Sequence, residues 1–137
     1  MTTRKAIDRL TYDIIGAAIC VHRQLGPGLL ERVYHEFLRD ELHERNHRIS
    51  YEKNVVVSYG GRKLDSTLKY DMLVDDLVVV EIKATEKLLP IHTSQLLTYM
   101  RTLRKPKGLL LNFNCTNIFK HGQKTLVNEY YSALPPS

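Results

Sequence analysis

The chain has 137 residues, 43% of them hydrophobic and 26% charged, which are the proportions of one globular domain spanning residues 1–137. No apolar run approaches the length of a membrane span, and the first residues lack the apolar core of a signal peptide, so we expect a cytoplasmic protein that does not bind membranes. The net charge of +5 is compatible with a polyanionic partner, and two cysteines are too few to form a zinc or iron–sulfur site made of cysteines.

The first third of the chain predicts two helices. Apolar side chains recur at three- and four-residue steps over residues 6–25, and Gly26 followed by Pro27 ends that helix. A second helix is predicted over residues 29–45. In it, Glu31 falls on the edge of the apolar stripe, so that its carboxylate would face inward. The pattern is equally compatible with a first-turn glutamate that only complements the helix dipole.

Three strands with short turns are predicted next. Residues 51–59 and 62–74 read as strands joined by a hairpin turn at Gly60-Gly61. The third strand, residues 77–84, is a nearly continuous apolar run of the kind that is buried on both faces of a sheet.

Two charged residues, Glu81 and Lys83, end this apolar strand and point to the same face. Asp71 lies opposite Glu81 if the loop between the strands has an odd number of residues, either 75–77 or 74–78, or if a bulge restores the parity. The two carboxylates, with Cβ atoms roughly 5 Å apart, would repel each other unless a divalent cation lay between them. Lys83 would then orient a water or stabilise developing negative charge, as metal-assisted phosphodiester hydrolysis requires.

A helix is predicted over residues 92–103, with Gln95 and Tyr99 four residues apart on one face. A second fully apolar strand follows at residues 109–113. A strand, a helix and a strand at this spacing form a crossover between two parallel strands.

The remaining residues carry weaker patterns. We expect one short strand near Ile118 and another near Leu126. The last residues, Leu-Pro-Pro-Ser, are expected to fray.

Gly28, Glu31 and Tyr34 carry the motif of the GxxExxY proteins, a family assigned to the PD-(D/E)XK nuclease superfamily, and the chain resembles this family from the first helix to residues 109–113. The resemblance implies an α/β fold with a PD-(D/E)XK restriction-endonuclease-like core, in which a central mixed β-sheet is flanked by helices.

Within the superfamily the sequence is similar to RecB-type nuclease domains, whose site combines a helix carboxylate, a strand Asp, a Glu-x-Lys and a downstream Gln-x-x-x-Tyr. The matching residues here are Glu31, Asp71, Glu81, Lys83, Gln95 and Tyr99. The resemblance implies Mg²⁺ or Mn²⁺ held by Asp71, Glu81, the carbonyl of Ile82 and Glu31. It also implies that Gln95 and Tyr99 orient the nucleic acid or the water.

These features favour a metal-dependent nuclease that hydrolyses phosphodiester bonds of DNA through a metal-activated water. The alternative is a nucleic-acid-binding or regulatory module on a nuclease fold with little or no turnover. A structural ion-pair cluster of Asp71, Glu81 and Lys83 is disfavoured, because two acids and one base leave a buried charge uncompensated. The chain lacks the added elements with which larger relatives grip DNA, so a partner protein or a homodimer is one way to complete the substrate site.

Overall fold

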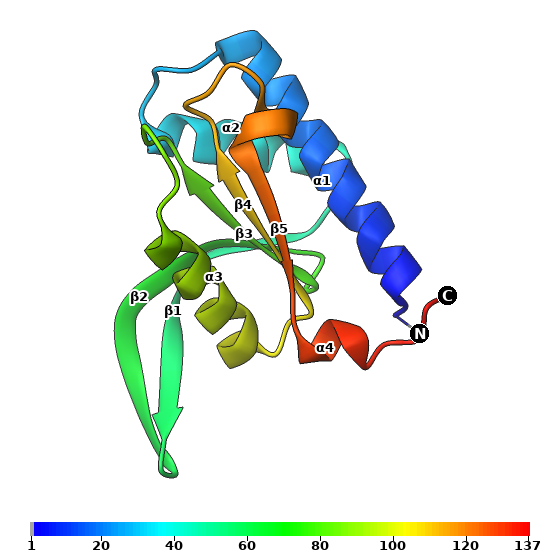
Figure 1. Ribbon diagram of the computed structural model, residues 1–137, viewed down its shortest axis with the longest axis vertical. Coiled ribbons are helices and arrows are strands. Elements are labelled where there is room, and N and C mark those ends of the chain that lie inside the picture. Colours follow the sequence, from blue (N-terminus) through cyan, green and yellow to red (C-terminus); the bar gives the residue numbers. More distant parts are fainter. Residues whose placement is uncertain (1) are drawn as a thin grey trace.

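A mixed five-stranded sheet forms the centre of the computed structural model, which describes residues 2–137 except the side chains of Glu52, Lys53 and Thr67 (Figure 1). In chain order the elements are α1 (Arg4–Leu25), α2 (Glu31–Glu44), β1 (Ile49–Tyr59), β2 (Arg62–Val74), β3 (Val78–Lys83), α3 (Pro90–Leu103), β4 (Lys107–Asn112), the π-helical turn η1 (Ile118–Gly122), β5 (Gln123–Val127) and α4 (Glu129–Ser132). The strands lie in the order β1-β2-β3-β4-β5, and only β3 and β4 run parallel. The α/β class and the central mixed sheet flanked by helices are therefore confirmed.

The strand β3 is buried on both faces, as its apolar run predicted. Val78, Val80 and Ile82 pack into the core formed with α1 and α2. Val79 packs into a second core with side chains of α3. Because side chains alternate along a strand, Glu81 follows Val79 on the face that α3 covers.

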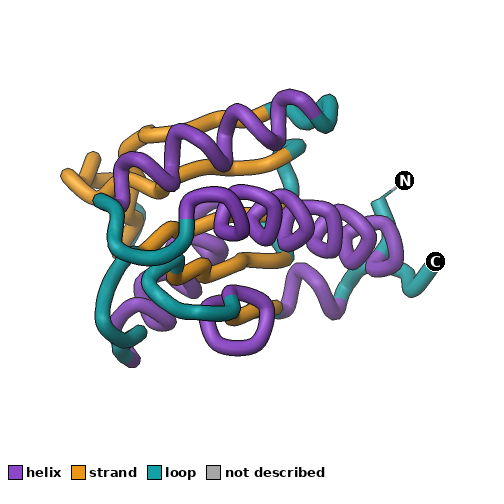
Figure 2. Tube along the Cα trace, turned by 90° about the horizontal axis from the view of Figure 1, so that it is seen from above, coloured by secondary structure: helices purple, strands orange, loops and turns teal. Residues whose placement is uncertain are grey.

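The last residues of the chain do not fray, contrary to the prediction. The backbone N–H groups of Arg4 and Lys5 donate hydrogen bonds of 2.8 and 3.1 Å to the carbonyls of Pro135 and Pro136. The first N–H groups of a helix have no acceptor within the helix itself, so the tail supplies acceptors to α1. Seen from above, both termini lie at the same end of the molecule (Figure 2).

Of the two short strands expected near the end of the chain, one is present and one is not. Leu126 lies in β5, as predicted. The prediction of a strand near Ile118 is wrong, because this residue begins the π-helical turn η1. The side chain of Asn117 accepts a hydrogen bond from the Lys120 N–H at 3.0 Å, and Ile118 is buried against the α1 core. Capping and burial thus override the local strand pattern.

The hairpin of β1 and β2 extends well beyond the rest of the sheet (Figure 1). Its turn is formed by Gly60 and Gly61, whose φ angles of 58° and 79° suit a two-residue hairpin turn. The register between the strands shifts near Val55, opposite residues 66–68. We call residues 55–68 the arm. None of the described helices is long and apolar enough to cross a bilayer.

Candidate active site

The hairpin of β2 and β3 brings Asp71 opposite Glu81. Val74 pairs with Val78 and Met72 pairs with Val80, so the loop between the strands has three residues. Of the two loop lengths compatible with the sequence, the structure has the shorter one. Asp75 and Asp76 occupy left-handed conformations in this loop, with φ angles of 51° and 59°.

At this point the two carboxylates replace the hydrogen bonds of the sheet. The Asp71 N–H donates to Oε1 of Glu81 at 2.8 Å, and the Ile82 N–H donates to Oδ2 of Asp71 at 2.7 Å. The regular backbone pairing of β2 with β3 ends at Met72. The carboxylates therefore lie where the two strands part, each held in place by a backbone N–H.

Burial disfavours the charged form of both acids. It raises the pKa of Glu81 to about 8, and the negative charge of Asp71 adds to this shift. Burial likewise raises the pKa of Asp71, although the hydrogen bond from Ile82 and the positive charge of His35 oppose the shift. Without a cation the pair therefore does not readily carry both negative charges, because the neighbouring groups do not compensate them.

Lys83 and Glu31 act on the pair in opposite directions. The positive charge of Lys83 lowers the pKa of both carboxyls, and the negative charge of Glu31 raises them. Lys83 is half-buried, whereas Glu31 is exposed as the first residue of α2. Glu31 and Asp71 line the same open cavity of about 180 Å³, so the start of α2 reaches the pair.

The same cavity is lined by two basic residues that the sequence analysis did not select, Arg32 and His35. Nε2 of His35 is hydrogen-bonded to the carbonyl of Asp71 at 3.1 Å, and His35 is only 7% exposed. Its spacing of four residues from Glu31 places both on one face of α2, which was the signal that could have identified it.

On the other side of the pair, α3 contributes Tyr99. This side chain is 2% exposed, and burial together with the charges of Glu81 and Asp71 raises the pKa of its hydroxyl to about 12. Gln95 lies one turn earlier on α3 and is half-buried. Tyr99 thus lies beside the carboxylates, with Gln95 on the same side of the helix.

The Gly28–Tyr34 motif shapes the loop that leads to Glu31. The Tyr34 hydroxyl donates to the carbonyl of Gly26 at 2.5 Å and accepts from the N–H of Leu29 at 3.1 Å. Its ring stacks on Phe113 with centroids 4.6 Å apart. Gly28 has a φ of 101°, a conformation that side chains with a Cβ rarely adopt. The glycine and the tyrosine therefore set where α2 begins.

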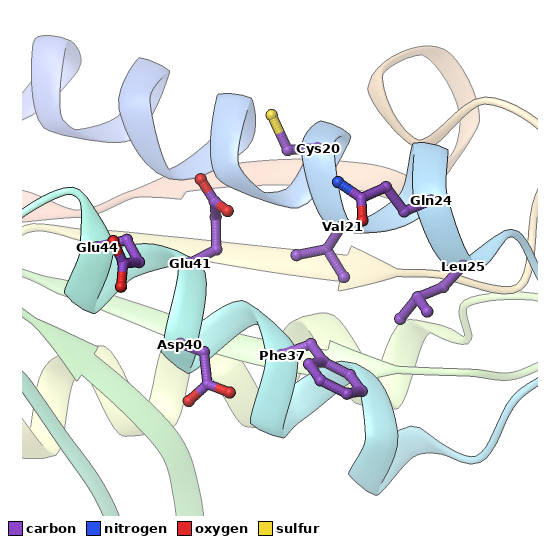
Figure 3. Close-up of a pocket in the computed structure, with 8 residues that line it drawn as sticks. All are labelled: Cys20, Val21, Gln24, Leu25, Phe37, Asp40, Glu41 and Glu44. Atoms are coloured by element: carbon purple, nitrogen blue, oxygen red, sulfur yellow. The ribbon is translucent and has the colours of Figure 1, made fainter.

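A separate cavity of about 400 Å³ lies between α1 and α2 (Figure 3). Its walls include the apolar Leu25 and Phe37, and its rim includes Asp40, Glu41 and Glu44. An acidic rim repels phosphates, so this cavity does not suit nucleic acid. The carboxylate pair is the better candidate for chemistry on a polyanion.

The donors of the pair suit a hard divalent cation, because carboxylate oxygens with uncompensated negative charge are the ligands that Mg²⁺ and Mn²⁺ prefer. Among the described side chains, however, no group of three or more from His, Cys, Asp or Glu is arranged to hold a metal ion. Glu31, although it lines the same cavity as Asp71, does not complete a three-carboxylate cluster.

Of the comparisons with known proteins, one finds a match, and it agrees with the fold. No curated protein and no solved structure matches the chain significantly. A family model described as the PD-(D/E)XK nuclease superfamily matches residues 8–125, which include every residue selected above as a candidate for the site. The predicted resemblance is confirmed at the level of the superfamily: the chain belongs to the PD-(D/E)XK nuclease superfamily.

Proposed function

We propose that the protein is a metal-dependent nuclease that hydrolyses phosphodiester bonds of DNA. The observation that carries this proposal is the buried pair of Asp71 and Glu81, each anchored by a backbone N–H. Burying two like charges together lowers the stability of the folded state unless a cation binds between them. A metal site would explain why the chain keeps such a pair. The net charge of +5 is compatible with a polyanionic substrate.

Asp71 and Glu81 would hold Mg²⁺ or Mn²⁺ together with the carbonyl of Ile82, and Glu31 would approach from α2 as substrate binds. The ion, when bound, would supply an activated water and neutralise charge on the phosphate. Lys83, whose charge already acts on both carboxyls, would orient the water and stabilise the charge that develops on the phosphoryl oxygens.

From α3, Gln95 and Tyr99 would orient the nucleic acid or the water, Tyr99 from a buried position beside the carboxylates. The Tyr99 hydroxyl is neutral at physiological pH, like that of an ordinary tyrosine, and burial raises its pKa further, to about 12. It can therefore donate a hydrogen bond to a phosphate oxygen. The amide of Gln95, one turn away, can bind an adjacent group of the same strand.

One observation favours the alternative, a nucleic-acid-binding or regulatory module with little or no turnover. Among the side chains that the structure describes, no cluster of three metal ligands is ready for an ion. A site of two carboxylates binds a divalent cation more weakly than one of three, since affinity rises with the number of charged ligands.

The test uses the purified chain with labelled single- and double-stranded DNA and RNA, in Mn²⁺ and in chelator. We expect hydrolysis of DNA only with metal, and a rate reduced by about 100-fold or more in Lys83→Ala. Lys69→Ala is the matched control, because Lys69 is an exposed lysine two residues from Asp71. Equal losses in both variants would mean that bulk charge, not a placed amine, is responsible. Binding of Mn²⁺ and DNA without any hydrolysis would support the alternative.

A further inference from the structure

The outer edge of β1 is unpaired in the described part of the chain, since β1 is the first strand in the order of the sheet. Within the arm this edge consists of residues 55–59, Val-Val-Val-Ser-Tyr, which include no charged residue and no proline. Proteins usually protect an exposed edge with a lysine, a proline or a covering element, because its free N–H and C=O groups can pair with another strand. Residues 55–59 contain neither a lysine nor a proline.

The arm also exposes apolar side chains. Val57 and Leu64 pair across it, and Tyr59 lies near its tip. Leu64 is 59% exposed and Tyr59 is 89% exposed, although both are large. A two-stranded ribbon is only marginally stable by itself and is stabilised by a third strand or by a packing surface. The arm is therefore suited to receive another strand.

We propose that the arm is a dimerisation element, in which the β1 strands of two copies pair antiparallel across a two-fold axis along residues 55–59. Two-fold antiparallel pairing is self-complementary, because each copy offers the same row of donors and acceptors to the other. An uncharged strand meets an identical strand without repulsion between like charges. The two five-stranded sheets then form one continuous sheet, and the exposed side chains of the two arms come together.

Nucleic acid fits this edge less well than a second copy. Affinity for nucleic acid comes mainly from cations placed against phosphates, and residues 55–59 provide none. The basic residues at the tip, Arg62 and Lys63, belong to β2 rather than to the free edge. Dimerisation of the arm does not require nuclease activity and can be measured separately from it.

The geometry of the turn identifies a selective substitution. The two-residue turn makes Tyr59 and Arg62 a hydrogen-bonded pair, and such pairs alternate along the ladder. The N–H groups of Val57 and Tyr59 therefore point to β2, and the N–H of Ser58 points outward. Ser58→Pro removes a hydrogen-bond donor only from the free edge, where proline is tolerated. Ser58→Ala keeps that N–H and is the matched control.

The experiment is analytical ultracentrifugation of the full chain over a dilution series, with circular dichroism as the check of folding. With increasing concentration, we expect the unmodified protein and Ser58→Ala to approach twice the chain mass of 15.9 kDa. We expect Ser58→Pro to remain at the mass of a single chain, with an unchanged circular dichroism spectrum. A monomeric unmodified protein at every concentration, or a dimeric Ser58→Pro, would overturn the proposal. So would a monomer whose amides in residues 55–59 become protected from exchange only on addition of DNA.

If Ser58→Pro does not fold, charged variants of the exposed Val57 test the same contact. Val57→Lys places like charges on the two arms and should give a monomer, as should Val57→Asp. An equimolar mixture of the two variants should recover the dimer, because opposite charges then meet across the interface. A mixture that stays monomeric while the unmodified protein dimerises would place the interface elsewhere and refute the proposal.

Discussion

The proposed chemistry of this protein depends on individual residues at the point where β2 and β3 part. Asp71 and Glu81 each accept a hydrogen bond from a backbone N–H, so their positions are held by the sheet. The same arrangement keeps two acids buried together, and burial raises the pKa of both. If the pair holds a cation, as we propose, the burial of two acids would lower the stability of the cation-free protein, which is typical of functional sites.

Asp71→Asn should therefore stabilise the metal-free protein. Asparagine retains an oxygen that can accept from the Ile82 N–H, and it removes the negative charge beside Glu81. We expect the free energy of unfolding in chelator to rise by about 1 kcal/mol. In Mn²⁺ the difference should narrow or reverse, because only the native pair gains binding free energy from the ion. Thermal melts in chelator and in Mn²⁺ measure both effects.

The control is Asp71→Ala, which removes the acceptor as well as the charge and should not stabilise the protein in chelator. A lower melting temperature of Asp71→Asn in chelator, together with no effect of Mn²⁺ on the native protein, would mean that the pair is a structural cluster with Lys83. That result would also count against the proposal that the protein is a metal-dependent nuclease.

At the scale of elements, the loop between α1 and α2 decides where Glu31 lies. Tyr34 closes this loop on itself through Gly26 and Leu29, and its ring is fixed on Phe113. The GxxExxY motif thus combines a residue that lines the cavity beside Asp71 with two residues that shape its approach.

Gly28→Ala and Tyr34→Phe should both weaken this loop. At Gly28 an added Cβ meets no atom within 4 Å, so the loss comes from the φ of 101° alone and should be about 1–3 kcal/mol. Tyr34→Phe keeps the stacked ring and loses two hydrogen bonds, at about 1–2 kcal/mol. Urea denaturation of the single and double variants measures these values, and the double variant should lose less than their total because both act on one loop.

Leu30→Ala is the control for the loop, since Leu30 is 77% exposed and its truncation should change stability by less than about 0.5 kcal/mol. A Gly28→Ala variant as stable as the native protein would show that the left-handed conformation is not required there.

At the scale of the whole molecule, His47 connects three parts of the chain. Its Nε2 lies 2.5 Å from Asp13 on α1, and its Nδ1 lies 2.7 Å from Asp75 in the β2–β3 loop. An imidazole can donate to two carboxylates only when both nitrogens are protonated. Burial lowers the pKa of His47, but the hydrogen bonds and charges of Asp13 and Asp75 outweigh it, and the pKa is raised.

His47→Gln should remove a part of the stability that depends on pH. A histidine with a raised pKa in the folded state contributes its full stabilisation below its ordinary pKa of about 6.5 and loses it as the pH rises through the folded value. Near pH 6 we expect the free energy of unfolding of the native protein to be about 2 kcal/mol higher than that of His47→Gln, because the native histidine makes two hydrogen bonds to charged groups. The difference should shrink at alkaline pH.

Urea denaturation of both proteins across this pH range, in chelator, provides the measurement. The difference between the two curves isolates His47, because the carboxylate pair of the site contributes equally to both. Curves that run parallel from pH 6 to alkaline pH would show that the histidine does not clamp the three segments in its charged form.

Periodicity and turn residues, which are local properties, were sufficient to predict most of the elements from the sequence. The apolar run of β3 required burial on both faces, and Gly60-Gly61 required a hairpin. The same local rules also indicated that Asp71 and Glu81 face each other, because the alternation of a strand leaves few registers. This much follows from neighbours along the chain.

Contacts between residues far apart in the sequence could be decided only by the tertiary structure. The sequence places His35 on the same face of α2 as Glu31, but only the tertiary structure shows that its ring reaches the Asp71 carbonyl. Ile118 leaves the predicted strand because the core formed with α1 buries it. The tail is ordered because α1 leaves N–H groups unpaired at the same end of the molecule. Patterns within one element contain no information on which distant element supplies the acceptor, the charge or the apolar surface that it meets.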